Sequence, residues 1–143
     1  MMRLKEVLES KKGDPVTVLT TATVADAIRA MSERRVGSVM VPYADGSPAG
    51  IFTERDVLRL CAEGRTDFAN MSIRPCMTCD ITTGQPGDTV SETLSTMTAK
   101  RFRHMPVVEN GKLVGVVSIG DLVKAKLEET AQEAQALREY IHS

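Results

Sequence analysis

The sequence predicts an α/β fold made of two β-α-β-β-α repeats and a C-terminal helical extension. Two internal matches predict it. Val24–Met31 is echoed by Val90–Met97, an offset of 66, and Gly50–Leu58 by Gly115–Val123, an offset of 65. A repeat of this length is a small supersecondary unit that does not bury its apolar face alone. We therefore expect the two copies to pack with pseudo-twofold symmetry and to form paired clefts between them.

In the first repeat, placed at residues 1–66 with the N-terminal segment, apolar and turn-forming residues define the elements. We expect a strand at 16–18, a helix from Val24, strands at 36–41 and 49–52, and a helix over 56–61. Thr23 is a suitable N-cap, and apolar residues follow it with helical spacing. Pro42 breaks the strand before it. Cys61 lies on the apolar side of its helix, so we expect it in the core.

The second repeat, placed at 67–127, follows the same order. We expect a strand at 81–83, a helix from Val90, strands at 105–108 and 114–119, and a helix from Asp121. Asn110-Gly111 predicts a tight hairpin turn. Residues 128–143 continue the last helix with an apolar residue every three or four positions. This extension either forms a dimer contact or packs back on its own domain.

Composition allows a compact core and indicates no charge-driven partner. Of 143 residues, 42% are hydrophobic and only 3% aromatic, so aliphatic residues and methionines fill the core. A net charge of −1 gives no overall attraction to nucleic acid or acidic membranes. The N-terminus lacks the apolar region of a signal peptide, and no apolar run approaches the ~18 residues of a membrane span. Three cysteines fit a reducing compartment. We expect a cytoplasmic protein.

Thr53-x-x-Asp56 and Ser118-x-x-Asp121 are the main candidates for function. Each follows a strand and opens a helix. One interpretation is a capping box, in which the hydroxyl and the carboxylate bond backbone N–H groups. The other is a ligand site, because a helix N-terminus attracts phosphate and a carboxylate accepts hydrogen bonds from both hydroxyls of a ribose. The two roles are compatible.

These motifs, together with the run Arg103–Val108, resemble cystathionine β-synthase (CBS) domains, here as a tandem pair spanning about residues 2–127. The chain looks like a stand-alone prokaryotic CBS-pair protein. The resemblance implies a regulatory module with two clefts that bind adenine nucleotides such as AMP, ADP or ATP, or, in some members, NAD or S-adenosylmethionine. Such a module would sense cellular energy or redox state.

The resemblance also implies which residues form each cleft. In one cleft, Ser118 lies near phosphate and Asp121 on the ribose. The residues that would frame the base are Val16, Val36, Gly37 and Val116. The other cleft would contain Thr53, Asp56, Ile51, Thr82 and Phe102. Phe102 is available to stack or pack on adenine.

Basic residues flank both clefts. Arg103 and His104 lie between a helix and a strand, where the family often places phosphate-binding side chains, and Arg55 lies inside the first motif. The alternative is a solvated helix end, since cations favour C-terminal turns. The first repeat has no counterpart of Pro106, so we expect the Ser118–Asp121 site to be the stronger one.

No group of residues indicates catalysis. Cys76-x-x-Cys79 could be a redox pair or half a zinc site, but no second such pair exists, so we expect no metal. We therefore predict a nucleotide-binding regulatory module, a homodimer acting on an unidentified protein, and not an enzyme. The alternative is a nucleotide-free interaction module that acts through dimerisation and its C-terminal helix. The sequence does not choose among AMP, ATP and NAD.

Overall fold

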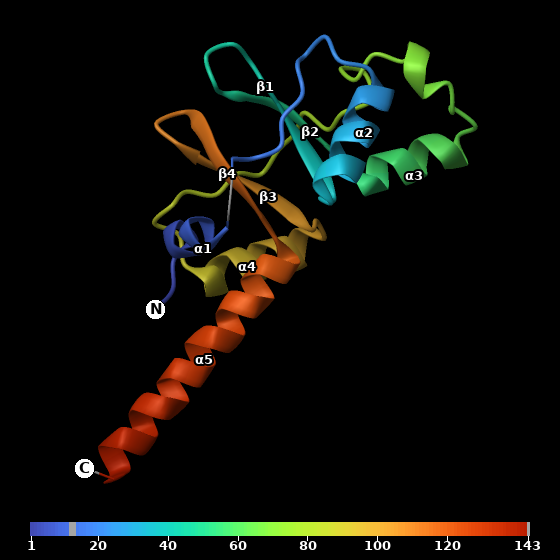
Figure 1. Cartoon of the computed structure of the whole chain (residues 1–143). Helices are drawn as coiled ribbons and strands as arrows, with labels where there is room; N and C mark the ends of the chain where they lie inside the picture. Colours follow the sequence, from blue (N-terminus) through green and yellow to red (C-terminus); the bar gives the residue numbers. More distant parts are fainter. Residues whose placement is uncertain (12–13, 143) are drawn as a thin grey trace. The chain divides into compact units, whose positions relative to one another are not determined.

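The computed structural model describes residues 1–11 and 14–142 and divides the chain into two compact units (Figure 1). The Thr53 unit consists of residues 14–82 and 108–114. The Ser118 unit consists of the described residues of 1–13, 83–107 and 115–143. Each unit therefore carries one copy of the Ser/Thr-x-x-Asp motif.

The Thr53 unit contains two helices, a strand pair and one short 3-10 helix. They are α2 (Val24–Arg34), β1 (Ser38–Pro42), β2 (Pro48–Thr53), α3 (Glu54–Ala62) and η1 (Phe68–Asn70). The strands pair antiparallel, with Ser38 opposite Thr53 and Val41 opposite Gly50, and the register shifts at Pro42. This pairing places the end of β2, and with it the first motif, beside the start of β1.

Helix α2 forms where the sequence predicts it. The Asp26 N–H donates to Thr23 Oγ1 at 3.1 Å, and the Thr23 N–H donates to Asp26 Oδ2 at 2.9 Å. This reciprocal cap satisfies donors that the helix start would leave open. The helix ends at Arg34, and the next residue, Arg35, adopts a left-handed conformation with φ of 55°. Its buried face is Val24, Ala27 and Met31.

The Ser118 unit is built mainly from helices around one hairpin. Its elements are α1 (Leu4–Ser10), α4 (Val90–Lys100), β3 (His104–Glu109), β4 (Lys112–Ser118) and α5 (Ile119–His142). Asn110 and Gly111 have φ values of 53° and 78°, which confirms the predicted tight turn. The hairpin tip, 108–114, belongs to the Thr53 unit, where the Leu113 N–H donates to Gly46 O at 2.9 Å.

Each unit has its own apolar core. The fully buried side chains of the Thr53 unit include Val39, Phe52, Leu60 and Ile73. Those of the Ser118 unit include Leu4, Val90, Met97, Val107 and Leu122. The N-terminal residue Leu4 thus lies in the same core as the second motif's helix.

Two segments outside the internal repeat complete these cores, and we call them supporting segments. Residues 2–11 support the Ser118 unit, where the Val90 N–H donates to Met2 O at 3.0 Å and the Leu4 N–H to Asp88 O at 2.9 Å. Residues 71–80 support the Thr53 unit through the matching bonds. These run from the Val24 N–H to Met71 O at 2.9 Å and from the Ile73 N–H to Ala22 O at 3.0 Å.

The supporting segments approach the second strand of each repeat closely. A Cβ atom added at Gly50 would lie 2.5 Å from Met77 Sδ, and one added at Gly115 would collide with Leu8 Cδ2. Both glycines therefore make room for the supporting segment. Packing groups residues 67–82 with the Thr53 unit and residues 1–11 with the Ser118 unit.

Three local expectations were wrong. The strand expected at 16–18 is reduced to a single bridge of Thr17 with Met40, and the strand expected at 81–83 is absent, with a single bridge of Gly84 to Val107 just after it. Each touches its neighbouring strand at one residue before the chain turns away, so no ladder forms. Cys61 is exposed, because the buried face of α3 carries Leu60 instead.

Candidate functional site

The first motif lies where β2 ends and α3 begins. The Thr53 N–H donates to Asp56 Oδ2 at 2.9 Å, and the Thr53 hydroxyl lies 3.4 Å from the same oxygen. Asp56 is only 7% exposed. A buried carboxylate needs hydrogen-bond partners, and the strand end supplies them. The capping interpretation of this motif therefore matches its geometry.

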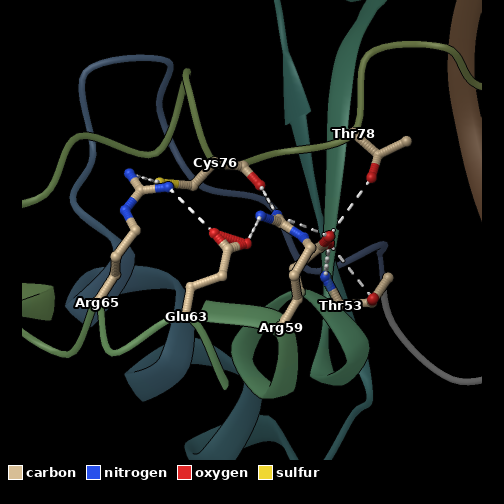
Figure 2. Close-up of polar contacts among 7 residues, drawn as sticks. Thr53, Arg59, Glu63, Arg65, Cys76 and Thr78 are labelled. Carbon is tan, nitrogen blue, oxygen red and sulfur yellow. Dashed lines mark hydrogen bonds and ion pairs between the residues drawn. The ribbon is translucent and has the colours of Figure 1, made fainter. Parts of the chain in front are cut away.

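The second oxygen of Asp56 also has partners. Arg59 Nη2 lies 3.4 Å from Asp56 Oδ1, and Thr78 Oγ1 lies 3.5 Å from it. Arg59 also donates to Cys76 O at 2.9 Å and to Glu63 at 3.2 Å, so these groups converge on one guanidinium (Figure 2). Burial alone would lower the pKa of Arg59, but its bonds to Glu63 and Asp56 raise that pKa overall. Asp56 is thus held through both oxygens.

The second motif lies where β4 ends and α5 begins. The Ser118 N–H donates to Asp121 Oδ2 at 2.9 Å, and the Asp121 N–H donates to Ser118 Oγ at 3.1 Å. This is a reciprocal capping box with Asp in place of the usual Glu. The Ser118 hydroxyl accepts in this bond, and it also hydrogen-bonds the Asp121 carboxylate, which lowers the pKa of that group.

A lysine from the supporting segment completes the second motif. Lys11 Nζ donates to Asp121 Oδ2 and to Val116 O, both at 2.8 Å. The side chains of Lys11 and Asp121 are 40% and 26% exposed, so the ion pair is open to solvent. Within residues 1–11 and 14–142, both side-chain bonds of Asp121 fall on Oδ2, which leaves Oδ1 as an open acceptor.

The charge state of Asp121 follows from these contacts. Burial alone would raise the pKa of its carboxyl group. The hydrogen bonds from Lys11 and from the Ser118 N–H, together with the positive charge of Lys11, hold the pKa below its ordinary value of 3.8. Asp121 is therefore ionised at neutral pH and accepts hydrogen bonds from hydroxyl groups.

The structure divides the predicted site residues between the two units. Val16, Val36, Gly37, Ile51, Thr53, Arg55, Asp56 and Thr82 lie in the Thr53 unit. Phe102, Arg103, His104, Val116, Ser118 and Asp121 lie in the Ser118 unit. Each hydroxyl is brought to the carboxylate of its own motif, as expected. The predicted clefts draw on both units, and their composition stays a prediction.

Backbone bonds show that the two repeats place these residues equivalently. The Glu54 N–H donates to Gly37 O at 3.1 Å, and the Ile119 N–H donates to Arg103 O at 2.9 Å. In both repeats, the N–H of the residue that follows the Thr or Ser of the motif thus donates to the carbonyl of the residue that precedes the first strand of the hairpin, β1 or β3. Gly37 and Arg103 are therefore fixed beside the motif of their own repeat.

One pocket of the Thr53 unit includes two predicted residues. Its volume is about 490 Å³, and it lies between the end of α2 and the start of α3. It is lined by Ile28, Met31, Ser32, Arg35, Val36, Gly37, Glu54 and Val57. Neither motif carboxylate lines it, so this pocket by itself does not form a ribose site.

The remaining candidates give no further site. In the part of the chain that the structure describes, no three His, Cys, Asp or Glu side chains gather as metal ligands. Cys76 is buried and Cys79 exposed, and both are free thiols. None of the described helices combines the length and apolar character that a membrane crossing requires.

Sequence reasoning missed three residues that contact the motif carboxylates. Arg59 lies three residues beyond Asp56, a spacing that places both on one helix face and could have been noticed. Lys11 and Thr78 come from the supporting segments and lie far from their partners in sequence. A third internal match could have revealed the supporting segments. Their apolar residues correspond at an offset of 69: Met2, Leu4, Val7 and Leu8 match Met71, Ile73, Cys76 and Met77.

Two repeats that each join a strand pair to a capped motif helix define a class of tandem-repeat α/β modules. The family model of the CBS domain matches residues 4–63 and 72–128. The chain therefore belongs to the CBS domain family and carries the domain twice, which confirms the resemblance. Each matched range begins within a supporting segment.

Known relatives agree with this assignment. A mitochondrial CBS domain-containing protein of Arabidopsis thaliana is 35% identical over 96% of this chain and 71% of its own length. A CBS-domain containing protein from Agrobacterium tumefaciens is 38% identical, with a TM-score of 0.81 over 87% of this chain and 99% of that one. A CBS domain protein from Pyrobaculum aerophilum, solved in complex with AMP, is 33% identical, with a TM-score of 0.78 over 92% and 99% of the two chains.

Proposed function

We propose that this chain is a regulatory module that binds an adenosine-containing ligand and does not catalyse a reaction. The observation that carries the proposal is the second motif, where an ionised carboxylate with an open oxygen and a serine hydroxyl share one helix start. A ribose diol can donate to such a carboxylate, and a phosphate can accept from the hydroxyl. The AMP complex of the Pyrobaculum aerophilum relative supports AMP as the first ligand to test, before ATP and NAD.

The proposed site combines residues of both repeats, as the family resemblance implies. Ser118 would contact the phosphate and Asp121 the ribose, while Val16, Val36, Gly37 and Val116 frame the base. Thr53, Asp56, Ile51, Thr82 and Phe102 form the second, weaker site, and Arg103, His104 and Arg55 contribute positive charge.

A ligand that binds both repeats favours one relative arrangement of them, so binding shifts the population of arrangements that a partner protein recognises. We place the module in the cytoplasm as a homodimer.

Thermal unfolding with AMP, ADP, ATP, NAD, NADH and S-adenosylmethionine tests the proposal. A ligand present at about 100 times its dissociation constant stabilises the folded state by about 2.7 kcal/mol, so we expect the Tm to rise by about 5–10 °C. Asp121→Ala should abolish the shift. No shift at millimolar concentration with any of these ligands would contradict ligand binding.

A second candidate function is a nucleotide-free interaction module, favoured by α5. Along this helix Leu127, Leu137, Tyr140 and Ile141 are all at least 60% exposed. Glu129 must be retained, because it accepts a hydrogen bond from the Met2 N–H at 2.8 Å. Deleting the residues after Thr130 separates the two functions. Loss of assembly with unchanged ligand binding assigns α5 to the interaction alone, whereas loss of both would show that ligand binding depends on assembly.

A further inference from the structure

The two motif carboxylates receive different groups from their supporting segments. Asp56 is approached by a neutral hydroxyl, Thr78 Oγ1, at 3.5 Å. Asp121 is approached by an ammonium group, Lys11 Nζ, at 2.8 Å. The supporting segments are matched in their backbone bonds and in their contacts with Gly50 and Gly115. Different positions of the two segments reach the carboxylates, because Lys11 and Thr78 do not align at the offset of 69.

Lys11 and the Ser118 N–H together fill the hydrogen-bond acceptor sites of one carboxylate oxygen, Asp121 Oδ2. An ionised carboxylate offers about two lone-pair sites on each oxygen. On Asp121 Oδ2, the Ser118 N–H occupies one and Lys11 Nζ the other. A vicinal diol that bonds both oxygens therefore needs one of these donors to leave. A single hydroxyl needs only Oδ1, which is open.

Of the two donors on Oδ2, only Lys11 is free to exchange. The Ser118 N–H is fixed by the backbone at the strand end, within a reciprocal cap. The Lys11 ammonium sits at the end of a long side chain that is 40% exposed and has water as an alternative partner. Its backbone is held separately, because its N–H donates to Leu8 O at 3.2 Å and Leu8 packs against Gly115. Lys11 can therefore leave Asp121 without unfolding α1.

We propose that Lys11 sets the ribose affinity of the Ser118 motif, because the ribose diol of the ligand and the Lys11 ammonium compete for Asp121 Oδ2. We call the contact between Lys11 Nζ and Asp121 Oδ2 the latch, and binding of the ligand breaks it. This inference rests on the proposed function, since it needs a ribose ligand at Asp121. It makes the two motifs unequal, because only at the Ser118 motif does the supporting segment supply a cation that the ligand displaces.

Isothermal titration of wild type and Lys11→Met with adenosine tests the latch. Adenosine carries the diol but no phosphate, so loss of the lysine charge does not weaken it through phosphate attraction. An exposed ion pair contributes little, so we expect Lys11→Met to bind adenosine about two- to fivefold tighter. With 3′-deoxyadenosine, which lacks the 3′-hydroxyl and so has no vicinal diol, the two proteins should bind equally. Lys5→Met, which removes an exposed lysine of α1, is the matched control and should behave as wild type.

Each other result overturns the latch in a distinguishable way. Weaker adenosine binding by Lys11→Met would make the lysine a ligand contact. Equal binding by wild type and Lys11→Met would show that the ion pair does not compete, and would leave the proposed function intact. An equal gain for adenosine and 3′-deoxyadenosine would show a general charge effect. If neither protein binds adenosine or AMP, the proposed function fails, and the latch fails with it.

Discussion

The Thr53 and Ser118 motifs share one backbone frame and differ in what surrounds the carboxylate. In both, the N–H of the hydroxyl residue donates to the aspartate Oδ2 at 2.9 Å. Asp56 is then held on its second oxygen by Arg59 and Thr78, whereas Asp121 keeps that oxygen open. The comparison teaches that similar cap motifs can differ in how many oxygens of the carboxylate are bonded by neighbouring side chains.

The largest expected effect comes from breaking the supporting segment of the Ser118 unit. Leu4 is fully buried in that core, so Leu4→Ala should lower the free energy of unfolding by about 2–5 kcal/mol, measured by urea denaturation. Leu19→Ala, at a position that is 75% exposed and outside this core, is the control and should stay within about 0.5 kcal/mol of wild type. Similar small losses for both variants would mean that α1 does not support this core.

The next effect compares the two carboxylates directly. Asp56→Asn should cost about 2–3 kcal/mol of stability, because a buried charged acceptor of several hydrogen bonds is lost. Asp121→Asn should cost about 1 kcal/mol, because its ion pair with Lys11 is partly exposed. Denaturant unfolding of the two variants measures both values. The reverse order would contradict the conclusion that Asp56, held through both oxygens, contributes more to stability.

The pH dependence of stability sharpens the comparison further. The pKa of Asp121 is lower in the folded protein than its ordinary value of 3.8, so the unfolded chain binds the proton more readily. The stabilisation from Asp121 is therefore fully present above about pH 4 and lost as the pH falls through the lower, folded-state pKa. The difference in unfolding free energy between wild type and Asp121→Asn should be constant from pH 7 to pH 5 and shrink below pH 4.

Lys11→Met gives the control for that pH profile. Without the lysine, the folded-state pKa of Asp121 moves back toward its ordinary value, so the loss should still begin near pH 4 but be complete at a higher pH and be smaller. An unchanged profile in Lys11→Met would show that the Ser118 N–H alone holds the carboxylate ionised.

The smallest expected effect is at Thr78. Its hydroxyl lies 3.5 Å from Asp56 Oδ1, at the limit of a hydrogen bond, while its backbone pairs with Ile51 in both directions at 2.9 Å. Thr78→Val removes the hydroxyl and keeps the backbone pairing and shape. We expect the free energy of unfolding, measured by thermal unfolding, to change by less than about 0.5 kcal/mol. A loss above 1.5 kcal/mol would show that the supporting segment holds Asp56 through this side chain.

Local patterns predicted the helices and the turn but not the supporting segments. The apolar spacing after Thr23 and the Asn110-Gly111 pair each determine structure within a few residues, so the sequence reveals them directly. Helix α1 has only seven residues, too few for a periodic signal. The motif caps were predictable, since hydroxyl and carboxylate lie three residues apart. Lys11 was not, because it meets Asp121 across 110 residues of chain.

The N-terminal supporting segment packs with residues from the second half of the chain, and this affects folding during synthesis on the ribosome. Helix α1 is made first, yet its core partners Val90 and Leu122 are among the later residues to emerge. Most of the Thr53 unit is complete once residue 82 has left the exit tunnel. Nascent chains emerge N-terminus first, so Leu4 and Val7 remain uncovered until nearly the whole protein exists. Such long-range closure slows folding.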